Sequence, residues 1–244
     1  MQLPVDNAES ELVIEAVCKS LDSSSYVLLS KTIGLYDDPS SIPVVSGALV
    51  KVIDESGVEF VFAENPDELG RYENPSFSVL PNRNYKLEVA YDEGFYSAES
   101  RSLTLPQIDS LFVVQDAGGV GSGGDTTNYL IYTVSDNPDE QNYYRFVLWV
   151  NGVQKKEVFI ETDDLGNGET YTSPFFGVTF DSGDEVYGEL WSMNKQTYSY
   201  FSAFFTNLNQ GPFSAAPSDL PSNLSDGKGY FGVVMVDTTT IIIP

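Results

Sequence analysis

The sequence predicts an all-β protein made of two β-sandwich domains, and three observations support this fold class. Apolar and polar residues alternate with period two along most of the chain, as in NYKLEVAY at 84–91. Turn signals rich in Asp, Asn, Pro and Gly separate these runs, which is typical of sandwiches. The chain has 244 residues, of which 41% are hydrophobic, so it can bury a core.

Residues 1–105 are expected to form the first sandwich, and TLPQIDS at 104–110 marks the join to the second half. Its lone cysteine, Cys18, shares one face of the first strand with Leu12 and Ile14, so we expect a small buried hydrophobe there. The alternating runs predict strands at 11–19, 25–32, 48–54, 58–63, 84–91 and 95–103.

Residues 106–244 are expected to form a second sandwich with one amphipathic helix near 194–208. Asn194 or Ser192 is a suitable N-cap for this helix, and Gly211-Pro212 a suitable stop. Its Phe201, Phe204 and Phe205 recur at helical spacing and are expected to pack on the second sheet. Strands are predicted at 127–134, 143–150, 153–161, 171–180, 184–192 and in the final run YFGVVMV.

Charge and composition exclude several functions. Lys and Arg number 12 against 36 Asp and Glu, a net charge of −24, which disfavours binding to nucleic acid and to anionic lipid. Histidine is absent, so Ser–His and Cys–His nucleophile pairs and His-based zinc sites cannot form. Carboxylates abound, but the sequence gives no way to pair two of them across a cleft, so a hydrolase stays a rival that needs two converging carboxylates in a structure. We therefore expect no enzymatic activity, no catalytic residues and no cofactor.

Two loops resemble ligand motifs. AGGVGSGGD at 117–125 contains a GxGxxG frame, but a predicted strand follows it where the dinucleotide fingerprint needs a helix, so we interpret it as a linker loop. ETDDLGNGET at 161–170 places several oxygens in a short turn, which makes Asp163, Asp164 and Asn167 a weak calcium candidate. Such turns are more often simply solvated.

The order of several segments resembles known families. The first half contains VVSGALVKVIDESG, LGRYENPSF and PNRNYKLEVAYDEGFYSAES, which resemble transthyretin-like or carboxypeptidase-regulatory-like sandwiches. The second half contains PQIDSL, NYYRFVLWVNG, GDEVYGELWSMNKQTYSYF and GPFSAAPSDLPSNLSDGKGYFGV. Together they resemble the Bacteroidota lipoproteins grouped as domain-of-unknown-function family 4249.

This resemblance implies an outer-membrane lipoprotein, anchored through a lipid-modified cysteine that follows a secretion leader. The chain begins at Met1, and Cys18 lies too far into a strand to be the anchor, so we expect leader and anchor cysteine to be absent from it. The resemblance also implies a TonB-dependent outer-membrane receptor as partner. It brings no catalytic residues.

The proline- and glycine-rich segment 210–229 precedes the last strand and is either a packed crossover or a docking surface. The candidates for partner or ligand contact are Phe213, Trp191, Tyr230 and Phe231, although Trp149 and Trp191 also suit a sandwich core. The expected function is a non-catalytic accessory or ligand-presenting subunit of a TonB-dependent receptor. A surface carbohydrate-binding module and an adhesin are the alternatives.

Overall fold

The computed structural model describes residues 10–22, 25–34, 37–38, 42–116, 127–157, 159–163, 166–208 and 219–244. Within these ranges the protein is all-β, with two sheets and a single helix, as predicted. The first half contains β1 (Leu12–Lys19), β2 (Tyr26–Lys31), β3 (Leu49–Asp54), β4 (Glu59–Glu64), β5 (Arg71–Glu73), β6 (Asn84–Tyr91) and β7 (Gly94–Arg101). The second half contains β8 (Gln107–Asp116), β9 (Thr127–Ser135), β10 (Tyr143–Val150), β11 (Val153–Gln154), β12 (Phe159–Thr162), β13 (Thr170–Pro174), β14 (Glu185–Met193), α1 (Lys195–Leu208) and β15 (Lys228–Ile242).

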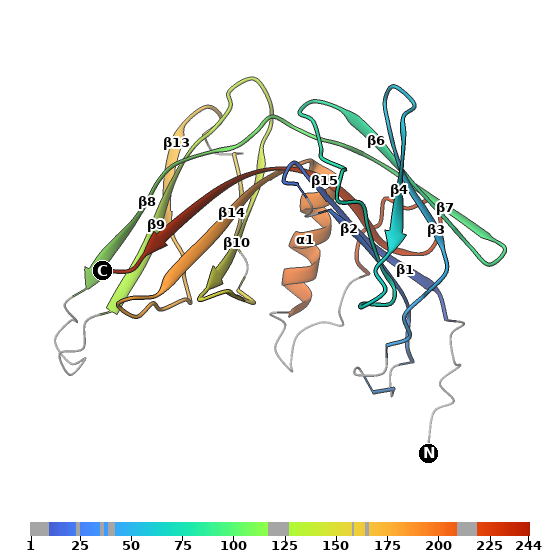
Figure 1. The fold of residues 1–244 in the computed structure, drawn as a ribbon. Coiled ribbons are helices and arrows are strands. Elements are labelled where there is room, and N and C mark those ends of the chain that lie inside the picture. The colour runs from blue at the N-terminus through green and yellow to red at the C-terminus, as the bar shows by residue number, and fades with distance from the viewer. Residues whose placement is uncertain are drawn as a thin grey trace, which may run out of the picture.

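The larger sheet runs in the order β11-β10-β14-β15-β1-β2-β5-β4-β3-β6-β7, and β12 also pairs with β10. The smaller sheet has the order β13-β9-β8. In Figure 1 the strands gather in two groups on either side of α1, and β15 runs from one group to the other.

Strand β15 connects the two halves of the chain. Its residues 228–234 pair in parallel with β1, and its residues 235–242 pair antiparallel with β14. Alternate side chains serve different cores: Phe231 and Val233 pack in the core of the first half, whereas Val234 and Val236 pack beneath α1. Burial on both faces explains the unbroken apolar run FGVVMV. The division at 105/106 stays a prediction, but the end of the chain is built into the first half's sheet.

The predicted helix is confirmed as Lys195–Leu208. Asn194 is its N-cap, because its Oδ1 accepts from the Thr197 backbone N–H at 2.9 Å. The Asn194 Nδ2 donates to Ser100 Oγ at 2.8 Å and to the Arg101 carbonyl at 3.0 Å, which holds the start of the helix on β7. No helix in the described ranges is long and apolar enough to cross a membrane.

Several strand predictions differ from the structure. Strand β8 was not predicted, since its alternation is broken by a bulge between Ile108 and Ser110. The three-residue β5 is too short to show periodicity. The run 153–161 forms two short strands rather than one, and the strand expected at 171–180 ends at Pro174. The prediction for Cys18 is confirmed: it is fully buried, and burial raises the pKa of its thiol.

Candidate functional site

A cavity of about 330 Å³ opens where α1 begins, and we call it the α1 groove. Three elements form its walls: the first turns of α1, the connection 221–223 and the start of β15. Its lining residues are Lys195, Gln196, Thr197, Ser199, Pro221, Ser222, Asn223, Tyr230 and Phe231. The groove lies beside the segment that the sequence singled out.

The connection that walls the α1 groove is fixed to two strands. Asn223 pairs with Phe231 like a strand residue: its Nδ2 donates to the Phe231 carbonyl and its Oδ1 accepts from the Phe231 N–H, both at 2.9 Å. The Ser225 N–H donates to the Ser97 carbonyl of β7 at 2.7 Å. These hydrogen bonds hold the described part of segment 210–229, residues 219–229, against β15 and β7. Phe213 lies outside the described residues.

The floor of the groove is formed mainly by aromatic side chains, together with Thr197. The Tyr230 ring lies 4.1 Å from the Tyr200 ring, centroid to centroid, and 5.2 Å from that of Phe201. Thr197 is buried, and its Oγ1 has no hydrogen-bond partner among the described residues. A Cβ on Gly232 would meet the Thr197 Cγ2 at 2.9 Å, so glycine lets the helix approach the sheet. Such a floor suits an apolar side chain.

Three of the predicted contact residues are buried rather than presented at the surface. Tyr230 is 7% exposed, Trp191 4% and Phe231 0%. The reason is the position of β15, which lies between β1 and β14 with α1 packed over one face. Tyr230 and Phe231 contribute only to the floor of the groove. The Trp191 Nε1 donates to Glu189 Oε2 at 2.7 Å, so this tryptophan belongs to the core.

Of the two loops that resemble ligand motifs, the structure describes most of 161–170 but not 117–125. Asp163 is buried, and its Oδ2 accepts from the Asn142 backbone N–H at 2.8 Å, so this carboxylate secures the loop. Asn167 is exposed, and Asp164 lies outside the described residues. Among the described residues, no group of three or more His, Cys, Asp or Glu is placed to hold a metal ion. The glycine-rich loop 117–125 lies outside the described residues, and the strands flanking it, β8 and β9, pair antiparallel.

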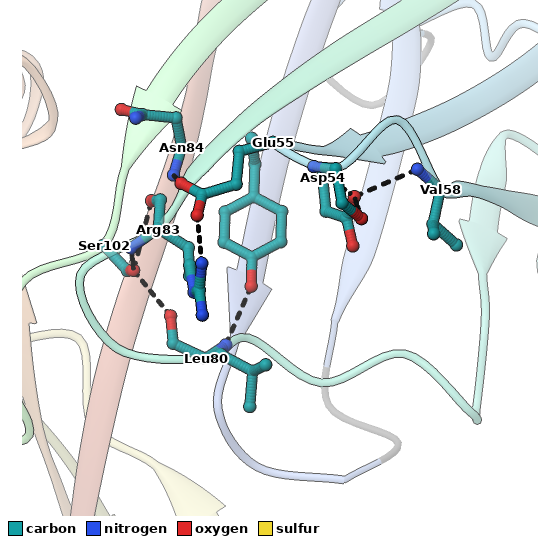
Figure 2. A network of polar contacts seen from close by, with 9 residues as sticks. Asp54, Glu55, Val58, Leu80, Arg83, Asn84 and Ser102 are labelled. Atoms are coloured by element: carbon teal, nitrogen blue, oxygen red, sulfur yellow. Dashed lines mark hydrogen bonds and ion pairs between the residues drawn. The ribbon is translucent and has the colours of Figure 1, made fainter.

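A second cavity, of about 230 Å³, lies at the ends of β3 and β6. Figure 2 shows that its polar groups are bound to one another. Glu55 forms an ion pair with Arg83 and accepts from the Asn84 N–H at 3.2 Å. The Ser102 Oγ donates to the Leu80 carbonyl at 2.7 Å. Because these groups satisfy one another's hydrogen-bonding capacity, we interpret the network as a contact that holds two turns together rather than as a ligand site.

Comparison with known families assigns the whole chain. The sequence profile of a domain of unknown function (DUF4249) matches residues 1–240. The chain belongs to the DUF4249 family. This confirms the family that the order of segments predicted. No curated protein matches the sequence, so the function of this DUF4249 protein has to be argued from its own residues.

The stability of the protein is expected to depend on pH through Glu15, whose strand partner Tyr230 forms part of the floor of the α1 groove. Glu15 of β1 lies opposite Tyr230 in the strand pair and accepts from the Tyr200 hydroxyl at 3.5 Å. Burial raises the pKa of Glu15 above its ordinary value of 4.5. The folded state thus binds the proton of the Glu15 carboxyl group more tightly than the unfolded chain does. The stability that protonated Glu15 contributes is therefore present below pH 4.5 and is lost as the pH rises through the raised pKa. Glu15→Gln is expected to increase the free energy of unfolding at pH 7, with a gain that shrinks toward pH 4.

Urea denaturation between pH 4 and pH 7 measures this effect, and Glu64 supplies a control of opposite sign. Its carboxylate accepts from the backbone N–H groups of Gly70 at 2.9 Å and Gly47 at 3.0 Å, which holds its pKa below the ordinary value. Glu64→Gln should therefore lose stability at pH 7 and approach the wild type in acid. Parallel pH profiles for Glu15→Gln and the wild type would contradict the prediction.

Proposed function

We propose that this DUF4249 protein is a non-catalytic binding subunit of the cell envelope. It is anchored to the outer membrane by an N-terminal lipid and acts as an accessory or ligand-presenting subunit of a TonB-dependent receptor. The anchor and the receptor come from the resemblance described above. The composition supports the non-catalytic part of the proposal, because a chain without histidine lacks the usual general base near neutral pH.

The observation that carries the proposal is the α1 groove. Docking sites need a concave, partly apolar surface held in shape before the partner arrives. The groove has that character: Asn223 fixes one wall to β15, and Asn194 fixes the other wall to β7. A receptor segment with an apolar side chain is the occupant that we propose. Its side chain covers the ring of Tyr230, which forms part of the floor of the groove.

The experiment is a pull-down of the full-length, lipidated protein from gently solubilised outer membrane of the native host, followed by mass spectrometry. A stoichiometric TonB-dependent receptor is the expected result. Ser199→Trp fills the groove and should remove the receptor. Ser76→Trp, at an exposed turn outside the groove, should keep it. Recovery of the protein alone, or equal recovery of the receptor by both variants, would contradict the proposal.

A second candidate function, carbohydrate binding or adhesion, has an observation of its own. The outer face of the β13-β9-β8 sheet carries exposed apolar side chains, because Phe112 and Val114 of β8 share it with Tyr129 and Ile131 of β9. Phe112 and Tyr129 are each 40% exposed. Exposed aromatics on one flat face can stack on sugar rings or anchor another protein.

This alternative is tested separately from the receptor. The wild type and a Phe112→Ser/Tyr129→Ser variant are screened against a panel of oligosaccharides by calorimetry and tested for self-association by ultracentrifugation. Saturable sugar binding or self-association that the double variant abolishes would favour the alternative. Identical behaviour of both proteins would eliminate this face from either role.

A further inference from the structure

The few basic residues of the second half are unevenly distributed. Residues 106–244 contain five bases, and the whole chain carries a net charge of −24. Three of the five line one cavity of about 400 Å³. The five bases are Arg145, Lys155, Lys156, Lys195 and Lys228, of which the first three line the cavity. The cavity, which we call the Arg145 pocket, lies between β10, residues 154–157 and the C-terminal half of α1.

Arg145 is the unusual member of this pocket. Its guanidinium carbon lies 4.1 Å from the centre of the Phe201 ring and 4.8 Å from that of Trp191. Its Nε is buried without a hydrogen-bond partner, and Arg145 forms no ion pair with any described residue. The buried carboxylate of Glu189 is already bound, by Lys19 at 2.8 Å and by Trp191 at 2.7 Å. Removing a guanidinium from water is costly. The nearby Glu189 carboxylate favours the charged form of Arg145 but forms no ion pair with it, which leaves Arg145 able to bind an external anion.

The two lysines reinforce this positive charge. The Lys155 backbone N–H donates to the Leu148 carbonyl at 2.8 Å, which places the loop against β10. Neither Lys155 nor Lys156 pairs with an acid in the part of the chain that the structure describes. Glu157 is the acidic residue among the lining side chains, so three bases and one acid leave a net charge of +2. The pocket is therefore locally positive, although the chain as a whole carries a net charge of −24.

The opposite wall of the pocket is apolar. Phe204 and Leu208 project from α1 and are 38% and 61% exposed. We propose that the Arg145 pocket binds a small organic carboxylate with an apolar or aromatic body. The planar fork of a guanidinium matches a carboxylate in two parallel hydrogen bonds, and the apolar wall takes the body of the ligand. The volume of about 400 Å³ is within the range of small-molecule sites.

This site is separate from the α1 groove. The groove is lined by residues 195–199 in the first turns of the helix, whereas the pocket is lined by Phe204 and Leu208 near its end. Ligand binding and receptor docking can therefore fail independently. The inference does not depend on the receptor proposal.

Phenylacetate is a suitable probe, with phenylacetamide as its uncharged counterpart and inorganic phosphate as an anion without an apolar body. Trp191 contacts Arg145, so tryptophan fluorescence reports binding, and calorimetry gives the affinity. Saturable binding of phenylacetate, at least about tenfold tighter than that of either control, is the expected result. Equal binding of acid and amide would overturn the proposal. Phosphate binding as tightly as phenylacetate would also overturn it.

Two variants locate the binding. Arg145→Met keeps the length and apolar stem of the side chain and should abolish saturable binding. Lys155→Met/Lys156→Met changes side chains on a surface loop and should weaken binding about tenfold with the fold intact. Lys228→Met, which removes an exposed charge at the start of β15 outside both cavities, is the matched control and should bind like the wild type. If the double variant binds as tightly as this control, the pocket is not the site.

Discussion

Gly229→Ala is expected to destabilise the protein by about 4 kcal/mol or more, one of the largest effects open to a single methyl group. Gly229 has a φ of +109° and lies opposite Ile14 in the parallel pairing of β15 with β1. An added Cβ would lie 2.0 Å from the Ile14 carbonyl oxygen and 2.8 Å from its carbonyl carbon. Neither atom can move without breaking the strand pair, so the substitution separates the strands that connect the two halves.

The measurement is the free energy of unfolding in urea, with amide exchange of β1 as a local probe. Gly57→Ala is the matched control, because Gly57 also has a positive φ, +87°, but a Cβ there would meet nothing within 4 Å. Gly57→Ala should lower the free energy of unfolding by only about 1 kcal/mol, the cost of holding an alanine at a positive φ. If the two variants are equally stable, β15 does not pass β1 in this register.

The sequence predicted those parts of the fold that depend on local pattern. Alternation located most strands, and Asn194 followed by helical spacing located α1. The role of β15 was beyond the sequence, because an apolar run such as FGVVMV shows burial on both faces but not which strands cover them. Its neighbour β1 lies more than 200 residues away in the sequence.

The candidate sites show the same limit. The sequence leaves Tyr230 and Trp191 as candidate contacts because an aromatic residue in a strand has the same sequence signature whether it is buried or exposed. Their burial is decided by α1 and by the strands around them. The Arg145 pocket combines residues 145, 155–156 and 204–208, and no short motif joins them. The available signal was the scarcity of bases in the second half. Only the fold shows that three of them meet.

Loss of one partner of the Lys19–Glu189 ion pair is expected to cost about 3–5 kcal/mol. Lys19 ends β1 and Glu189 lies in β14, the two strands that flank β15, so their contact of 2.8 Å crosses the junction between the halves. Both side chains are buried, at 9% and 7% exposure. Burial lowers the pKa of Lys19, and the nearby Glu189 carboxylate opposes this shift. Lys19→Met therefore leaves a buried carboxylate whose remaining hydrogen bonds from described residues come from Trp191 and Tyr187.

A double-mutant cycle with Glu189→Gln separates the pair from its surroundings, because glutamine keeps an acceptor for the Trp191 Nε1. The double variant should be destabilised by less than the sum of the single variants, with a coupling of about 1–3 kcal/mol, since removing both charges leaves neither unpaired. Lys51→Met is the control. Lys51 and Glu59 also lie 2.8 Å apart, but at 26% and 51% exposure, so the loss of this solvent-screened pair should cost much less than the loss of the buried one. Equal costs at the two sites would mean that water screens Lys19 as it screens Lys51, and would contradict the burial of the Lys19–Glu189 pair.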